Sequence, residues 1–222
     1  MARIIYWRVS RPATLPLDGP PGPAEERRLR RGLAQGPQDA APWLLGKWLV
    51  RRRGRSVLVA RIVETEAYLG DGDPAAHSFR GRTPRNTPVW GPPGTVYIYF
   101  VYGMHHCLNL AVDEEGVPGC VLIRAAESVG GALDRSACRG PGRLCRTLGL
   151  DTGHSGLYLF EPGAVLTLRD GPPPHSIAVS PRIGIRHAAE RPLRFFDADS
   201  PAVPAVSKAW RPRSVRVRSP SP

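Results

Sequence analysis

Residues 64–109 read ETEAYLGDGDPAAHSFRGRTPRNTPVWGPPGTVYIYFVYGMHHCLN. Two carboxylates stand at the start of this stretch, arginines and a histidine occupy its middle, and a run of tyrosines broken by glycine closes it. Thr95–Val101 consists of β-forming residues and Cys107–Val112 is the expected return strand, so residues 102–104 form the tip of a two-stranded ribbon. The stretch therefore predicts a strand end, a long loop and a hairpin.

The strand that leads into this stretch is expected over Val57–Tyr68, following a turn at Gly54. A period of two would place Ile62, Glu64, Glu66 and Tyr68 on one face, and Val63, Thr65 and Ala67 on the other. Glutamates two apart on a strand lie ~7 Å apart with parallel side chains, which does not suit the acid and base of a sugar hydrolase. We expect one catalytic glutamate and one structural partner for arginine.

Gly70–Gly94 is predicted to be a long loop, rich in glycine, proline, aspartate and arginine. Long loops inside a compact domain are usually functional or disordered, and His77 with Arg80, Arg82 and Arg85 favours a functional loop. On the following strand Tyr97 and Tyr99 share a face. Such tyrosines pack into a core more often than they bind a ligand, so both readings stay open.

The rest of the chain predicts short strands and a few helices. Helices are expected near Ala24–Ala34, over Ala40–Leu45 with Asp39 as N-cap, and over Leu144–Leu150. A further strand is expected to begin at Trp48, and another to cover Val117–Arg124 with a bulge at Gly119. Shorter strands are expected at Gly163–Arg169, Arg182–Ile185 and Pro192–Phe196. This is the α+β class: a single mixed domain, mainly antiparallel, with a protruding hairpin. We expect an irregular Pro/Gly/Arg-rich extension over 1–37, a domain over 38–206 and a basic disordered tail over 207–222.

Charge and composition narrow the classes of partner. The formal net charge is +12 and the only lysines are Lys47 and Lys208, so arginine supplies nearly all the positive charge. A polyanion is the expected partner, and a merely soluble basic surface is the alternative. Acid–base side chains beside aromatic rings in such a chain favour an enzyme acting on a nucleobase.

Other compositional features argue against metals and membranes. The four cysteines have no C-x-x-C spacing, and a metal pair at His105 and His106 is disfavoured because adjacent strand residues face opposite ways. Residues 1–7 are too short for the apolar core of a signal peptide, and no apolar stretch approaches the ~18 residues of a membrane span. We expect a cytoplasmic protein, nucleoid-associated if bacterial, that needs no cofactor or metal and makes no membrane contact.

Several motifs, in the same order, resemble those of the alkyladenine (3-methyladenine) DNA glycosylases. They cover roughly 44–206 and are IVETEAY (62–68), AAHS (75–78), TPRN (83–86), GTVYIYFVYGM (94–104), CLN (107–109), VLIR (121–124), GPGRL (140–144), RIG (182–184) and PLRF (192–195). The resemblance implies a monomeric single domain whose hairpin enters the minor groove of double-stranded DNA containing damaged purines.

The resemblance also implies a role for each matching residue. Glu66 matches the base that activates water, with Arg124 helping to hold that water. The damaged base would be bound by Tyr68 on one side and by His77 and Tyr99 on the other, with Asn109 rejecting guanine and Ile183 lining the pocket. By the resemblance, Tyr102 intercalates with Met104 beside it, and Arg143 contacts DNA. Arg82 and Arg85 are also expected to contact DNA, because they belong to the basic loop.

The expected reaction is hydrolysis of the N-glycosidic bond of 3-methyladenine, hypoxanthine or ethenoadenine. No lysine lies near the motifs, so a Schiff-base lyase step is not expected and the enzyme would be monofunctional. A non-catalytic nucleic-acid-binding module of related fold is the main alternative, and a carbohydrate glycosidase is a third.

Overall fold

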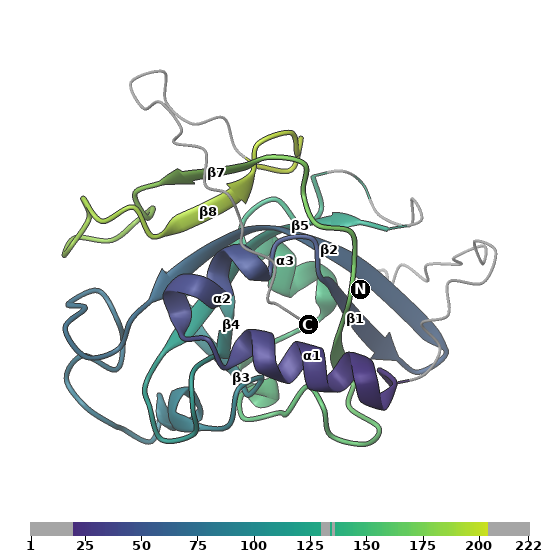
Figure 1. Cartoon of the computed structure of the whole chain (residues 1–222), viewed down its shortest axis with the longest axis horizontal. Helices are drawn as coiled ribbons and strands as arrows, with labels where there is room; N and C mark the ends of the chain where they lie inside the picture. The colour runs from purple at the N-terminus through teal and green to yellow at the C-terminus, as the bar shows by residue number, and fades with distance from the viewer. Residues whose placement is uncertain (1–19, 130–133, 135, 204–222) are drawn as a thin grey trace.

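The computed structural model describes residues 20–129, 134 and 136–203. Its central element is β2 (Ser56–Tyr68), a 13-residue strand. One edge of β2 pairs first with β1 (Trp48–Arg53) and then with β8 (Arg194–Asp197), while its other edge pairs with β5 (Cys120–Ser128). Because both of its edges are paired, β2 is an interior strand of the sheet (Figure 1).

The sheet is antiparallel throughout its described pairings. Its order is β3 (Val96–Val101), β4 (His105–Ala111), β5, β2, β1 and β6 (Leu166–Arg169), and β7 (Ile177–Ser180) joins through β8. The predicted α+β class with a mainly antiparallel sheet is confirmed. In Figure 1 the α1 and α2 helices cross the front of the sheet, and the β7–β8 pair lies at the top of the view.

The helices lie close to their predicted positions, with one clear correction. α1 (Pro23–Leu33) and α3 (Pro141–Leu148) match the expected segments within three residues. α2 runs over Pro37–Trp43, and Asp39 lies in its first turn instead of capping it. Gly36, at φ 82°, and the proline that follows it begin the helix, because proline's fixed φ suits the first helical position.

Three strand predictions are wrong in detail. β5 begins at Cys120 instead of residue 117, and Gly119 lies outside the strand, where it packs so closely on Pro37 that a Cβ would meet that ring at 2.7 Å. Residues 182–185 form no strand. β7, which the sequence analysis missed, is a short buried pairing whose four residues carry too little pattern to be recognised.

A β-bulge in β2 alters the predicted faces of that strand. The register with β5 shifts between Ile62 and Glu64 and again between Glu64 and Thr65. Ile62 therefore joins the main core, whereas Val63 packs in a separate cluster with Ala125. The expectation that Ile62 shares a face with Glu64 is wrong, because an extra residue reverses the alternation at that point.

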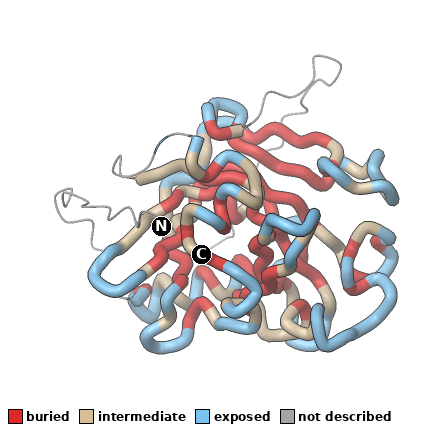
Figure 2. Tube along the Cα trace, turned by 180° about the vertical axis from the view of Figure 1, so that it is seen from behind, coloured by how far each residue is buried: buried red, intermediate tan, exposed pale blue. Residues whose placement is uncertain are grey.

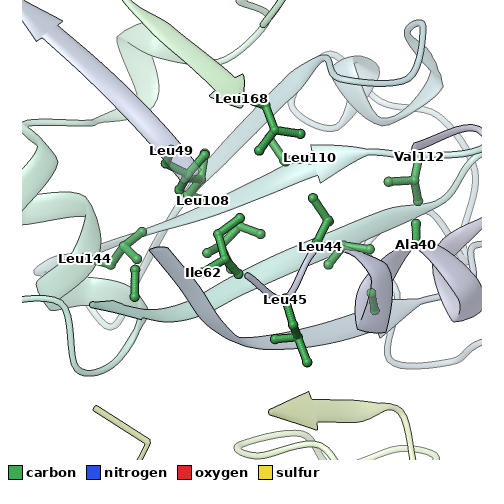
Figure 3. Packing of buried hydrophobic residues seen from close by; sticks show 14 of the residues in the cluster. Ala40, Leu44, Leu45, Leu49, Ile62, Leu108, Leu110, Val112, Leu144 and Leu168 are labelled. Atoms are coloured by element: carbon green, nitrogen blue, oxygen red, sulfur yellow. The ribbon is translucent and has the colours of Figure 1, made fainter. Parts of the chain in front are cut away.

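The main hydrophobic core lies between the helices and the inner face of the sheet. Leu29 and Leu33 of α1 are fully buried in it, so this helix is part of the folded body. In the view of Figure 3, Ile62 lies between Leu44, which follows α2, and Leu144 of α3. Figure 2 shows the buried stretches gathered in the interior and most of the exposed stretches at the periphery of the molecule.

Loop 70–94 consists of turns, bends and irregular backbone, with one short 3-10 helix, η1 (Thr87–Trp90). A second 3-10 helix, η2 (Thr152–His154), lies beside β3. The expected loop character of this segment is confirmed. Of the predicted irregular extension over 1–37, residues 1–19 lie outside the described residues, as does the predicted tail over 207–222, and residues 23–33 form α1.

Candidate active site

A cavity of about 390 Å³ opens where the end of β2 meets the β3–β4 hairpin. Its walls come from β2, the 70–94 loop, β3, β4, β5, the start of α3 and the segment after β7. Its lining residues are Tyr68, Ala75, His77, Tyr97, Tyr99, Val101, Tyr102, Cys107, Asn109, Cys120, Leu122, Arg124, Pro141, Ile183, Gly184 and Ile185. Residues distant in sequence thus meet at one site.

Glu66 lies directly behind the wall of this cavity. Its side chain is fully buried, and three groups that line the cavity hold its carboxylate. Tyr68 Oη donates to Oε2 at 3.0 Å, the Ile183 N–H donates to Oε1 at 2.8 Å, and Arg124 Nη1 lies 3.3 Å from Oε1. The carboxylate is therefore fixed in orientation and separated from the cavity by a single layer of side chains.

Glu64 has a different set of partners from Glu66. Its Oε1 accepts hydrogen bonds from Arg124 Nε at 3.0 Å and from Arg194 Nε at 2.6 Å. Glu64 is thus the glutamate that serves as a structural partner for arginine. Its bonds to Arg124 and Arg194 tie β2 to β5 and β8. Arg124 bridges both carboxylates, so its guanidinium cannot rotate freely.

Burial raises the pKa of Glu66 above that of an ordinary glutamate. The Arg124 charge, the Ile183 N–H and the Tyr68 hydroxyl oppose this rise, and the neighbouring Glu64 adds to it. A raised carboxylate pKa beside a cavity is typical of a general base tuned towards neutral pH.

Aromatic rings line two parts of the cavity, the Tyr68 wall and the His77 wall. Tyr68 comes from β2, and His77 with Tyr99 comes from the loop and β3; the His77 and Tyr99 centroids are 4.4 Å apart at 70°. Tyr97 is almost fully buried, and its hydroxyl lies 2.9 Å from His77 Nδ1. Of the two readings left open for these tyrosines, the core reading holds for Tyr97, and ligand binding by Tyr97 and Tyr99 stays a prediction.

The surroundings of His77 favour its neutral form. Burial, together with the charge of Arg85, lowers the pKa of His77 below its usual value. Burial likewise raises the pKa of Tyr97 to about 12. The walls therefore carry no formal charge near neutral pH and present flat, neutral surfaces to a planar ligand.

Asn109 forms part of the cavity floor. It is 2% exposed, and its Nδ2 donates to the carbonyls of Tyr97 at 3.1 Å and Cys107 at 3.2 Å. Both amide hydrogens are used, so the group has a fixed orientation. The nearby thiol of Cys120 lies 4.0 Å from Oδ1.

The hairpin tip is the most exposed apolar feature near the cavity. Tyr102 and Met104 are 75% and 71% exposed, and Tyr102 also lines the cavity mouth. Tyr102 and Gly103 both have positive φ, 53° and 66°. The hairpin turn that suits the right-handed twist of its two strands requires positive φ at both central residues. Glycine at position 103 allows this geometry at no steric cost.

The three predicted DNA-contacting arginines have different surroundings. Arg143 is exposed in the first turn of α3, two residues after Pro141 of the cavity. Arg85 is exposed but donates Nη2 to the Phe100 carbonyl at 3.3 Å, which ties the loop to the hairpin. Arg82 lies over Trp90, 5.9 Å from the ring centroid, at a second hollow.

Sequence reasoning missed several residues that shape the site. Asp73, Arg182 and Arg194 are buried charges that support its walls, and Leu122 and Pro141 line it. Arg182 stood within a recognised motif, but nothing in the sequence paired it with Asp73. Within the described ranges no cluster of three metal-ligating side chains occurs, and His106 packs instead on Phe100 at 5.0 Å.

Known proteins match this chain over most of its length. The family model described as methylpurine-DNA glycosylase matches residues 31–201. The chain belongs to the methylpurine-DNA glycosylase family. Members of this family are DNA-binding repair enzymes of base excision, so this glycosylase is a 3-methyladenine or methylpurine DNA glycosylase by family.

Individual relatives agree with the family match. A protein of Methanocella arvoryzae is 41% identical over 74% of this chain and 89% of its own length. A protein of Myxococcus xanthus is 46% identical over 71% and 82%, and one of Chlorobaculum parvum is 42% identical over 86% and 96%. Each of the three is provisionally named a 3-methyladenine DNA glycosylase. In the glycosylase described here, none of the described helices is long and apolar enough to cross a membrane.

Proposed function

We propose that this glycosylase binds duplex DNA as a monomer, flips a damaged purine into the cavity and hydrolyses its N-glycosidic bond with water activated by Glu66. The substrates would be purines of the 3-methyladenine, hypoxanthine and ethenoadenine type. The observation that carries the proposal is the buried Glu66 carboxylate, which is held by three groups of an aromatic-walled cavity.

The chemical step needs one base and little acid. Water oxygen bonds to C1′ while the C1′–N bond breaks, its electron pair leaves with the purine, and Glu66 accepts the proton of the water. The carboxylate also stabilises the oxocarbenium-like sugar. 3-Methyladenine carries a positive charge in DNA and departs as a neutral base, whereas hypoxanthine and ethenoadenine depart as neutral bases only after the purine has taken a proton from solvent.

Water needs a place between the sugar and Glu66. The longest of the three carboxylate contacts is the one to Arg124 Nη1, at 3.3 Å, and Arg124 lines the cavity. We assign the attacking water to the cavity side of Arg124, where the guanidinium would donate to it, and Glu66 would exchange its contact with Arg124 Nη1 for one with this water in order to accept the proton. Ile183, at the same rim, then contacts the sugar side of the base.

Base recognition follows from the two walls. A flipped purine would stack on Tyr68 on one side and contact His77 and Tyr99 on the other, as extruded bases do in other enzymes that flip them. Asn109, with both amide hydrogens engaged, would present fixed bulk to the 2-amino group of guanine. Tyr102 would fill the gap left in the duplex, with Met104 beside it.

The contact surface for DNA would combine the hairpin tip with Arg143, Arg85 and Arg82. All three arginines are exposed, and the net charge of +12 favours binding to phosphate. The protein is proposed to act without a metal or other cofactor. Because its proposed substrate is duplex DNA, the protein is proposed to be located where the DNA of the cell lies.

The decisive experiment incubates the protein with duplexes that contain a single hypoxanthine, ethenoadenine or 3-methyladenine, followed by hot alkali. Strand cleavage at the lesion, absent from an undamaged duplex and absent without alkali, supports a monofunctional glycosylase. Binding of the damaged duplex with no cleavage would favour the non-catalytic module, and cleavage without alkali would reveal a lyase step.

A further inference from the structure

A buried ion pair joins Asp73 and Arg182 behind the base cavity. Arg182 Nη1 and Nη2 donate to Asp73 Oδ2 and Oδ1 at 2.6 and 2.8 Å, and both side chains are fully buried. Neither residue lines the cavity. Because a buried ion pair often adds little net stability over an apolar replacement, its contacts deserve a geometric explanation.

One side of the pair supports the Tyr68 wall. Arg182 Nη1 also donates to the Ala67 carbonyl at 3.0 Å, and the guanidinium carbon lies 4.7 Å from the centroid of the Tyr68 ring. A stacked cation of this kind restrains the ring as well as attracting it. The position of the Tyr68 ring is thus set from outside the cavity by Arg182.

Asp73, the other member of the pair, supports the loop that leads to the His77 wall. Asp73 accepts hydrogen bonds from the N–H groups of Leu69 at 3.1 Å and Ala75 at 3.2 Å. Ala75 lines the cavity, and His77 follows two residues later. Asp73 therefore shapes the turn that leads from the Tyr68 wall to the His77 wall.

Arg182 also precedes the residue that orients the carboxylate. The N–H of Ile183 donates to Glu66 Oε1 at 2.8 Å. Since Arg182 is held at three acceptor atoms, its neighbour cannot move away from Glu66 without breaking them. The pair thus contacts the Tyr68 ring and the backbone N–H of Ala75, and it adjoins the residue whose N–H holds Glu66.

We propose that Asp73 and Arg182 are positioning residues that set the separation of the Tyr68 and His77 walls and hold the Ile183 N–H on Glu66. The proposal rests on the proposed function, because it assigns the pair to base binding and water activation in that reaction. It explains why a bidentate, fully buried arginine is placed here: lysine cannot reproduce the two parallel hydrogen bonds and the flat stacking surface.

The test compares Arg182→Lys and Asp73→Asn with a matched control, Arg169→Lys. Arg169 is also a buried arginine paired to a carboxylate, with its Nε 3.0 Å from Glu25 Oε1, but it lies on β6 at the end of the sheet farthest from β3. Unfolding temperature, single-turnover excision of hypoxanthine and its pH dependence are measured for all four proteins.

All three variants are expected to lose some thermal stability. Only Arg182→Lys and Asp73→Asn are expected to lower the single-turnover rate, by roughly tenfold or more, because a small misplacement of reacting groups costs that much. They should also move the acid limb of the rate profile to higher pH. The reason is that the Ile183 N–H normally lowers the pKa of Glu66, which Arg124 and Tyr68 also lower and Glu64 raises.

Rates and acid limbs equal to those of Arg169→Lys would overturn the proposal. The proposal would also be overturned if Arg182→Lys and Asp73→Asn both failed to fold while Arg169→Lys folded, since the pair would then serve stability alone. If only one variant folds, that variant carries the same comparison. A wild-type protein without excision activity would instead overturn the proposed function, which separates the two outcomes.

Discussion

The Tyr68 hydroxyl donates a hydrogen bond of 3.0 Å to Glu66 Oε2, two residues away on the same strand. The same tyrosine ring lines the cavity and rests on Arg182. One side chain therefore links the proposed base-stacking surface with the proposed general base.

Replacement of Glu66 by glutamine should abolish excision and leave binding intact. Glutamine keeps the shape and the acceptor for Ile183 but cannot take a proton from water, so the rate should fall by about 10²–10⁴. Single-turnover excision and gel-shift affinity on the same hypoxanthine duplex measure the two properties. Substantial excision by Glu66→Gln would mean that another group is the base.

The same substitution should stabilise the fold at neutral pH. Burial raises the pKa of Glu66, so the ionised carboxylate costs stability above that pKa and nothing below the unfolded value of about 4.3. The unfolding temperature of Glu66→Gln should exceed that of the wild type at pH 7–8. The gap should shrink as the pH falls through the raised pKa, and a gap that grows with acidity would contradict the assignment.

Tyr102→Ala should weaken base flipping. The exposed ring at the hairpin tip would no longer occupy the space left by the extruded base, so affinity and excision should both drop for a paired lesion. The loss should be smaller for the same lesion opposite an abasic site, where extrusion is easier. Val165→Ala is the control, because Val165 is an exposed apolar residue directly before β6, at the end of the sheet farthest from β3. An equal loss for Tyr102→Ala on both duplexes would argue against a wedge role.

Asn109→Ala should admit guanine-type lesions. The amide is fixed by the carbonyls of Tyr97 and Cys107, so the wild-type side chain cannot turn aside for a 2-amino group. The ratio of excision of methylated guanine to that of hypoxanthine should therefore rise. This ratio, measured on matched duplexes, would remain unchanged if Asn109 played no part in discrimination.

Arg143→Ala should weaken binding equally for damaged and undamaged duplexes. Loss of one phosphate contact should reduce the slope of log affinity against log salt by about 1. Arg28 on α1 is the control, because it pairs with Asp170 beside β6 at the far end of the sheet. A slope change as large for Arg28→Ala would show that the effect is only net charge.

Local patterns predicted the elements that surround the site. Turn-forming and helix-starting residues act over a few positions in the chain. They predicted the turn at Gly54, the hairpin with residues 102–104 at its tip and the helix that follows Gly140. The loop before the hairpin could likewise be recognised, since its prolines and glycines exclude a strand. Errors arose where a local signal was outweighed, as in the bulge that moves Ile62 into the main core.

The sequence by itself determined an antiparallel α+β domain, an exposed aromatic hairpin tip and the set of residues that could carry base-excision chemistry, because strand period, turn residues and ordered motifs are local properties. Only the tertiary structure decided that Glu66 is held by Tyr68, Ile183 and Arg124, and that Asp73 meets Arg182. The physical reason is that these partners lie on separate elements. Their meeting depends on strand register and on charges that must find one another when buried, which no local pattern encodes.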